Sequence, residues 1–161
     1  MHKTDIIFQE LKPEDTDFLN QTEALFLDLH THLKPMGLTL DLIENGEKIW
    51  MTSVKNTLGK FSILVVAIYN NEVIGFGFGA LKFLPAYLGG EMIGHTTHMF
   101  VKESFRNMKI GYQLYEMLFN WFLMKNVKNI ETQIAGINPE VERFLKSIGF
   151  KYEFLQLRKF F

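Results

Sequence analysis

EMIGHTTHMFVKESFRNMKIGYQLYEMLFNWFLMKN, residues 91–126, is the stretch from which the rest of the chain is interpreted. It begins as an extended run that ends at Val101, continues as a polar loop around Arg106, and passes through Gly111 into a segment with helical periodicity. The apolar side chains of that segment recur at the spacing that places them on one face of a helix. They are Leu114, Met117, Leu118, Trp121 and Phe122. The stretch therefore predicts a strand, a loop and a helix.

The loop that enters this helix has the chemistry of an anion site. The first backbone N–H groups of a helix have no partner within the helix, and the helix dipole favours negative charge beside them. Gly111 allows a ligand to come close to the backbone because glycine has no side chain.

Residues 101–111 resemble motif A of the GNAT acetyltransferase superfamily. In that motif a strand that ends in valine is followed by Arg/Gln-x-x-Gly-x-Gly/Ala, which opens a helix. Arg106, Ile110 and Gly111 match in register, whereas Lys109 stands at the first glycine position. Lys109 is compatible with a cofactor loop if its φ is negative, and its ammonium could then reach a phosphate. Alternatively, it marks a loop that no longer binds the cofactor.

The resemblance implies that the protein binds acetyl-coenzyme A (acetyl-CoA) as a co-substrate. In the family the loop amides hold the pyrophosphate, and the backbone of the preceding strand pairs with the pantetheine arm. The positions implied as cofactor-binding in this part of the chain are Met99, Phe100, Val101, Arg106, Asn107, Met108, Lys109, Ile110, Gly111 and Tyr112.

A second motif, Asn-x-x-Val-x-x-Phe-Leu-x-x-Ile-Gly-Phe at residues 138–150, resembles the closing motif of the same family, Asn-x-x-Ala-x-x-Leu-Tyr-x-x-Leu-Gly-Phe. The resemblance implies that Asn138 lies near the pantetheine and that Phe144 packs beside the cofactor. Asn138 equally suits the N-cap of a helix, because Pro139 and Glu140 follow it.

The family's frequent general acid is the tyrosine of this closing motif, and Leu145 stands in its place. That role therefore does not carry over to this chain. The alternatives for protonating the leaving thiolate are Tyr112, Tyr115, Tyr152 or water.

The composition fits one soluble domain that spans residues 1–161. Its apolar content is 47%, and 16 Phe and 8 Met predict an aromatic, adaptable core. A net charge of −1 without a basic cluster argues against nucleic acid as a partner. Residues 1–5 open no signal peptide, and no apolar run approaches the length of a membrane span, so we expect a cytoplasmic protein without membrane contact. The absence of cysteine excludes disulfides and zinc–thiolate sites.

The remaining segments complete the element order of the GNAT fold. That fold is an α/β (α+β) domain with a mixed, mostly antiparallel central sheet flanked by helices. A second helix capped by Asp41 is interrupted by Asn45 and Gly46, so it begins late or is bent. We predict strands at 6–11, 61–69, 73–83, 91–101, 130–135 and 151–161, and helices at 18–33, 41–58, 111–126 and 139–148.

Two short patterns add detail to this order. Asn70 and Asn71 suit a tight hairpin turn, because asparagine tolerates positive φ. Gly75, Gly77 and Gly79 fall on one face of the second hairpin strand and predict that a large element packs across it.

Acetyl transfer to an amine requires a polarised thioester carbonyl, a neutral amine and a proton acceptor. Alternation along the 91–101 strand places His95 and Met99 on one side, and His98 and Phe100 on the other. In several family members a glutamate base occupies the position of His95, and a histidine suits that role. His98 and Glu91 are the other candidates, and a bulge in the strand could exchange the two histidines.

His30 and His32 close the first helix without a third metal ligand at a recognisable spacing, so no metal site is indicated. The resemblance makes residues 30–40 a candidate acceptor loop. Phe160 and Phe161 are either a homodimer contact or part of a last strand packed into the core.

Two functions stay open at this point. The first is an acetyl-CoA-dependent N-acetyltransferase, with a small-molecule primary amine preferred as acceptor and direct attack in a ternary complex. The second is a GNAT-fold module without turnover that binds acyl-CoA as a sensor or serves as an interaction domain.

Overall fold

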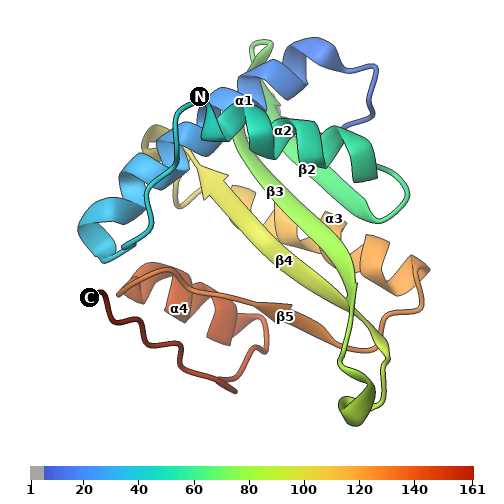
Figure 1. The fold of residues 1–161 in the computed structure, drawn as a ribbon. Coiled ribbons are helices and arrows are strands. Elements are labelled where there is room, and N and C mark those ends of the chain that lie inside the picture. The colour runs from blue at the N-terminus through green and yellow to red at the C-terminus, as the bar shows by residue number, and fades with distance from the viewer. Residues whose placement is uncertain (1–5) are drawn as a thin grey trace.

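A computed structural model describes residues 6–161, which form a five-stranded sheet with helices on both faces (Figure 1). The prediction that residues 1–5 open no signal peptide lies outside the described residues. The elements in chain order are β1 (Ile7–Glu10), α1 (Thr16–Leu33), a 3₁₀ turn (Lys34–Met36), α2 (Gly46–Thr57), β2 (Ser62–Tyr69), β3 (Glu72–Phe83), a 3₁₀ turn (Ala86–Leu88), β4 (Met92–Val101), a 3₁₀ turn (Glu103–Phe105), α3 (Ile110–Met124), β5 (Ile130–Thr132) and α4 (Pro139–Ser147).

The sheet has the strand order β1-β2-β3-β4-β5, with β1 to β4 antiparallel and β5 parallel to β4. This arrangement confirms the predicted mixed, mostly antiparallel sheet. Figure 1 shows α1 and α2 over one face and α3 over the other. The apolar core is accordingly divided into two clusters, one centred on Phe26, Met51 and Phe76, the other on Leu114 and Phe122. Among the described residues no helix is both long and apolar enough to cross a membrane.

Helix α3 lies close to the sheet because glycines on two strands leave room for it. A Cβ added at Gly77 would lie 3.2 Å from Leu118, and one added at Gly79 would lie 2.8 Å from the ring of Phe122. A Cβ at Gly94 on β4 would meet three atoms of the same ring at 2.8–2.9 Å. The predicted packing of a large element across the bare face of β3 is therefore confirmed.

Local signals in the sequence explain several element boundaries. Asn70 and Asn71 make the β2–β3 turn with φ of 49° and 63°. The side chain of Asn138 accepts a hydrogen bond of 3.2 Å from the N–H of Val141 and so caps α4. The proposed cap at Asp41 is wrong, because α2 begins only at Gly46. This agrees with the alternative, raised by Asn45 and Gly46, that the helix begins late. The Asp41 carboxylate instead pairs with Lys34 in the loop after α1.

A β-bulge changes the predicted faces of β4. The register against β3 pairs Phe78 with His98 and Gly79 with Thr96, which leaves Thr97 as the extra residue. Strict alternation across this point was wrong: the bulge does not exchange the two histidines but turns both toward α1 and α2. Met99 and Val101 pack on the α3 side.

The C-terminal segment 151–161 contradicts the predicted last strand. It has no regular secondary structure, and none of its backbone groups forms a hydrogen bond with another described residue. Phe160 and Phe161 are exposed, so their packing into the core is also wrong, while the homodimer contact stays a prediction. Strand β5 is shorter than predicted, because only Ile130–Thr132 of residues 130–135 pair with β4.

Candidate active site

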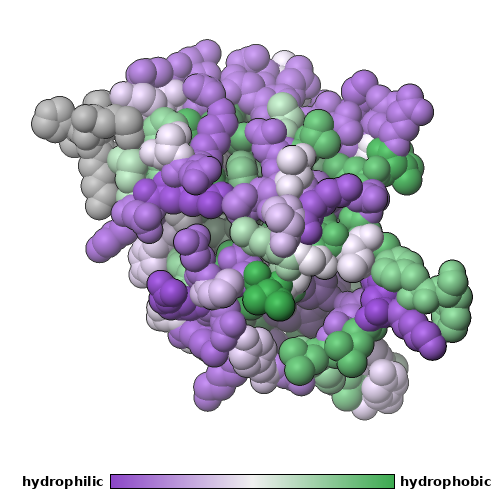
Figure 2. Space-filling view, turned by 90° about the vertical axis from the view of Figure 1, so that its left-hand side faces the viewer, coloured by the Kyte–Doolittle hydropathy of each residue, from purple (hydrophilic) through white to green (hydrophobic). Residues whose placement is uncertain are grey.

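β4 and β5 separate at the centre of the molecule and leave one edge of β4 open (Figure 1). Their pairing covers only Gly94, His95 and Thr96 on β4, opposite residues 130–132. Farther along, the N–H of Lys102 donates to Ile74 on β3 at 2.9 Å. Because backbone direction alternates along a strand, the N–H and C=O groups of Met99 and Val101 point away from β3, into the open edge. Figure 2 faces this end of the molecule and shows a recess between its upper and lower parts.

The loop that follows β4 presents a run of unpaired backbone donors. None of the N–H groups of residues 107–112 donates to an acceptor among residues 6–161. Asn107 and Lys109 both have φ of 62°, the left-handed conformation that occurs in backbone nests that bind anions. A Cβ at Gly111 would meet nothing within 4 Å, so the space in front of this backbone is open. The arrangement can hold a phosphate-like group.

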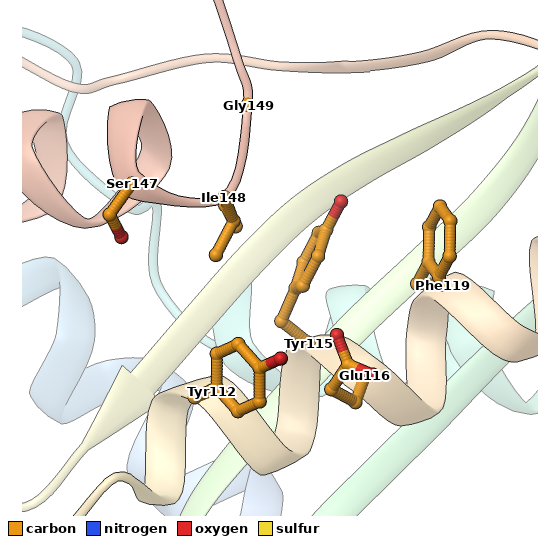
Figure 3. Close-up of a pocket in the computed structure, with 7 residues that line it drawn as sticks. All are labelled: Tyr112, Tyr115, Glu116, Phe119, Ser147, Ile148 and Gly149. Atoms are coloured by element: carbon orange, nitrogen blue, oxygen red, sulfur yellow. The ribbon is translucent and has the colours of Figure 1, made fainter.

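A cavity of 390 Å³ adjoins this loop between α3 and α4 (Figure 3). The side chains from α3 point across it toward the end of α4. Tyr112 belongs both to the run of free amides and to the cavity wall. The lining residues are Tyr112, Tyr115, Glu116, Phe119, Ser147, Ile148 and Gly149.

The loop after α1 lies beside the loop that joins β5 to α4. The N–H of Ile137 donates to the carbonyl of Met36 at 2.7 Å, and a Cβ at Gly136 would overlap with that carbonyl. The candidate acceptor loop, residues 30–40, therefore contacts the segment that leads into Asn138.

His98 lies on the face of β4 that is covered by α1 and α2. Its ring packs edge-on against Phe26 and Trp50, with centroid distances of 5.0 and 5.7 Å. Its Nδ1 lies 2.8 Å from the Thr97 hydroxyl, and that hydroxyl donates its own hydrogen to the carbonyl of Phe78 at 3.4 Å. The hydroxyl oxygen therefore accepts from His98, which places the hydrogen of the neutral imidazole on Nδ1. Burial, with His30 and His95 nearby, lowers the pKa of His98 to about 4. The imidazole is therefore neutral at pH 7.

His95 lies on the same face, at the point where β4 and β5 still pair. Its Nδ1 is 3.9 Å from a carboxylate oxygen of Glu131, which also forms an ion pair with Lys82. Its Nε2 is buried and has no hydrogen-bond partner among the described residues. Burial lowers the pKa of His95, Glu131 raises it and Lys82 lowers it. Nδ1 of His30 on α1 is likewise buried and unpartnered, and burial lowers the pKa of His30.

A family model described as an acetyltransferase (GNAT) domain matches residues 60–152, more than half of the chain. The chain belongs to the GNAT acetyltransferase family. This finding confirms the resemblance drawn from the two motifs, and with it the expected class of enzyme at the level of the family. No curated protein matches the sequence.

Solved structures confirm the GNAT fold. The aminoglycoside N-acetyltransferase AAC(6')-Iy in complex with CoA superposes with a TM-score of 0.75 at 13% identity, covering 96% of this chain and 94% of the other. A predicted acetyltransferase with acetyl-CoA from Clostridium acetobutylicum gives 0.74 at 18% identity, with coverage of 95% and 96%. Glucosamine-6-phosphate N-acetyltransferase from Arabidopsis thaliana gives 0.67 at 14% identity, with coverage of 97% and 99%.

Arg106 of the GNAT motif points back toward β4 and α1. Its Nε donates to the carbonyl of Val101 at 3.1 Å, and a terminal nitrogen lies 3.2 Å from Nε2 of His32. Its guanidinium also lies 5.8 Å from the ring centre of Phe100. The sequence did not indicate this link between the motif and α1.

The three tyrosines of this GNAT domain that are candidates for protonating the leaving thiolate differ in environment. Tyr115 is buried and packs edge-on against Phe144 and Phe150, and burial raises its pKa. Tyr112 is partly exposed in the cavity wall. Tyr152 is exposed beside Lys146 of α4, and a hydrogen bond with Glu142 raises its pKa.

The other predicted site residues are placed as follows. Glu91 precedes β4 and is exposed, and no described side-chain contact joins it to either histidine. Leu145 is buried. Among residues 6–161 no group of three or more histidine or acidic side chains is placed to hold a metal ion. Sequence reasoning missed Glu131, Lys82 and Trp50, since each lies on a different element from the motif and becomes a neighbour only through the sheet.

Lys109 departs from the GNAT motif, and the structure shows the backbone conformation that it adopts there. Its φ is positive, so the condition of a negative φ, under which Lys109 was compatible with the cofactor loop, is not met. The left-handed conformation is the one that glycine adopts without strain. The loop therefore keeps the backbone shape suited to a glycine, although a lysine occupies the position.

Lys109→Gly should stabilise the protein by about 1 kcal/mol, because the left-handed conformation costs a non-glycine residue on the order of 1–2 kcal/mol and glycine loses part of that gain in entropy. Urea unfolding measures the difference. Lys125→Gly is the matched control at the other end of α3, where φ is −84° and glycine brings no relief. A Lys109→Gly protein no more stable than the wild type would contradict the assignment of strain.

Proposed function

We propose that the protein is an acetyl-CoA-dependent N-acetyltransferase that moves an acetyl group to the primary amine of a small molecule by direct attack in a ternary complex. One observation carries the proposal: the open edge of β4 is followed, after a single 3₁₀ turn, by the free amides of residues 107–112. CoA has matching parts in the same order, because its extended pantetheine arm is joined to a pyrophosphate. Family membership and the CoA or acetyl-CoA in several structural neighbours support this choice of ligand.

In this proposal each part of the cofactor has a distinct contact. The N–H and C=O groups of Met99 and Val101 pair with the pantetheine amides, as another strand would. The amides of residues 107–112 surround the pyrophosphate, and the cavity between α3 and α4 takes a further part of the cofactor. Because Arg106 occupies the carbonyl of Val101, it has to move or share that acceptor when the arm binds.

The acceptor amine approaches from the α1 and α2 side, where His95 and His98 lie. The nitrogen attacks the thioester carbon, the new N–C bond forms, and the C–S bond breaks to release the CoA thiolate. A neutral imidazole takes the proton that the nitrogen loses, and the thiolate receives a proton from water or from Tyr115. Amino sugars and other small amines are the preferred acceptors, in line with neighbours that act on aminoglycosides and glucosamine 6-phosphate.

The alternative, an acyl-CoA sensor without turnover, is favoured by one observation. Leu145 is buried at the position where the family's closing motif has the tyrosine that acts as general acid. The side chain at this position therefore cannot protonate the thiolate. The two functions predict the same cofactor binding and differ only in turnover.

Titration calorimetry with acetyl-CoA is the first test, and we expect saturable binding of one molecule per chain. Gly111→Asp should weaken this binding at least about tenfold, since the added carboxylate would face the bound pyrophosphate. The same substitution places an acid in the first turn of α3, which favours the fold, so the loss would not reflect unfolding. Gly111→Ala is the matched control.

The outcomes separate the two functions. Absence of binding to the folded wild-type protein would overturn both. Binding followed by thiol release with a panel of amino sugars, polyamines, arylalkylamines and short peptides supports the enzyme. Binding without thiol release across the panel favours the sensor.

A further inference from the structure

We propose that Glu131 is a positioning residue for His95: it holds the imidazole with Nδ1–H toward the carboxylate, so that the lone pair of Nε2 faces the acceptor amine. Lys82 holds Glu131 in turn. The inference rests on the proposed function and adds two residues that neither motif contains.

Strand pairing places the three side chains together. His95 and Glu131 are direct partners in the parallel register between β4 and β5, and Lys82 lies on β3, on the other side of β4. The Glu131 carboxylate forms an ion pair with Lys82 and lies 3.9 Å from Nδ1 of His95. Three adjacent strands thus contribute a cation, an anion and an imidazole to one side of the sheet.

The orientation of the imidazole decides which nitrogen can act. A carboxylate that faces Nδ1 favours the tautomer in which Nδ1 carries the hydrogen. Nε2 is then an acceptor, and it is buried without a partner among residues 6–161. Burying an unpaired polar atom is unfavourable, which suggests that a ligand completes it. A general base requires a comparable arrangement, in which one nitrogen faces a carboxylate and the other has no hydrogen-bond partner within the protein.

His98 is less suited to the same role. Its Nδ1 also has a partner, the Thr97 hydroxyl, but its ring packs edge-on against the stacked rings of Phe26 and Trp50. Its pKa of about 4 makes it a weak proton acceptor at neutral pH. His95 has a carboxylate beside it that stabilises the imidazolium formed during the reaction, and His98 has none among its described contacts.

The groups that set the proton affinity of His95 come from each element around it. Glu131 on β5 favours the imidazolium, and Lys82 on β3 disfavours it. His98 on β4 and His30 on α1 lie on the same face, and both are neutral at pH 7 because burial lowers their pKa values. His32 on α1 and Arg106 lie farther along this face, beside Phe100. The two charged neighbours therefore act in opposite directions, and this difference provides a test.

The experiment is the pH dependence of kcat/KM for Glu131→Gln and Lys82→Met, with one amine substrate. Catalysis needs neutral His95, so activity falls as pH drops through its pKa. Glu131→Gln removes the group that raises this pKa and should move the acid limb to lower pH by about half a unit or more, with kcat reduced about tenfold through lost orientation. Lys82→Met should move the acid limb to higher pH. The titration of the amine is common to all variants.

The matched control is Glu72→Gln, which breaks the other cross-strand ion pair of the sheet, between Glu72 and Lys102, and should leave the acid limb in place. NMR titration of the His95 imidazole provides a readout independent of turnover and should show the same opposite shifts. The role of Glu131 alone would be overturned if the two variants shifted the His95 titration in the same direction, or not at all, while they bound acetyl-CoA like the wild type. Failure of the wild type to bind acetyl-CoA would instead overturn the proposed function.

Discussion

Replacing His95 with alanine should lower kcat by about 10²–10⁴-fold and leave the affinity for acetyl-CoA almost unchanged. The reason is that Nε2 of His95 is the only buried ring nitrogen on β4 without a hydrogen-bond partner among the described residues. The proposed cofactor contacts lie farther along the strand and in the loop. Thiol release under saturating amine measures kcat, and calorimetry measures acetyl-CoA binding. A shift in acetyl-CoA affinity as large as the shift in kcat would point to a disturbed fold instead of a lost base.

His98→Phe is the control for this experiment. A phenyl ring can keep the edge-on packing against Phe26 and Trp50, so we expect turnover within about tenfold of the wild type. Unchanged turnover in His95→Ala would remove His95 from the mechanism. If His98→Phe alone lost activity, the base would be His98.

Gly94→Ala should lower the free energy of unfolding by about 1–3 kcal/mol, the usual consequence of overpacking a core. The new Cβ would lie 2.8–2.9 Å from three atoms of the Phe122 ring, and Phe122 is fully buried between α3 and the sheet. In a domain of this size, the loss corresponds to a fall in Tm of about 2–12 °C. Thermal and urea unfolding measure both quantities.

Gly111→Ala is the matched control, because its Cβ would meet nothing within 4 Å. In the double variant Gly94→Ala/Phe122→Leu, the loss of stability should be smaller than the sum of the two single losses, because the smaller side chain makes room for the new methyl group. A double-mutant cycle measures this coupling. Equal stability of Gly94→Ala and Gly111→Ala would show that α3 moves away from the sheet without a measurable penalty.

The parts of the fold that the sequence predicted are those encoded locally. The spacing of Leu114, Leu118 and Phe122 identified the buried face of α3, and all three are fully buried. Asn71 and Asn138 marked a turn and a helix start because each suits one local backbone or hydrogen-bond geometry. The motif at residues 101–111 likewise identified the loop, since its chemistry resides in consecutive residues.

The parts that the sequence did not predict depend on contacts between distant segments. The bulge at Thr97 has no distinctive residue, and the register with β3 reveals it only in the folded sheet. Glu131 is one of many charged residues until pairing with β4 brings it beside His95. The sign of φ at Lys109 follows from the path of the loop, which side-chain type alone does not determine.

The unpaired C-terminal segment has a consequence for how the protein behaves in solution. Because residues 151–161 contribute no backbone hydrogen bond to the described fold, their removal would leave every helix and strand of that fold in place. The same residues expose Phe154, Leu155 and Leu157 to solvent, and apolar side chains lie along the lower right of Figure 2. Such a terminus favours self-association at high concentration. The helices and strands and the apolar terminus are thus separate parts of the chain, and truncation after Phe150 should reduce self-association while the described elements stay in place.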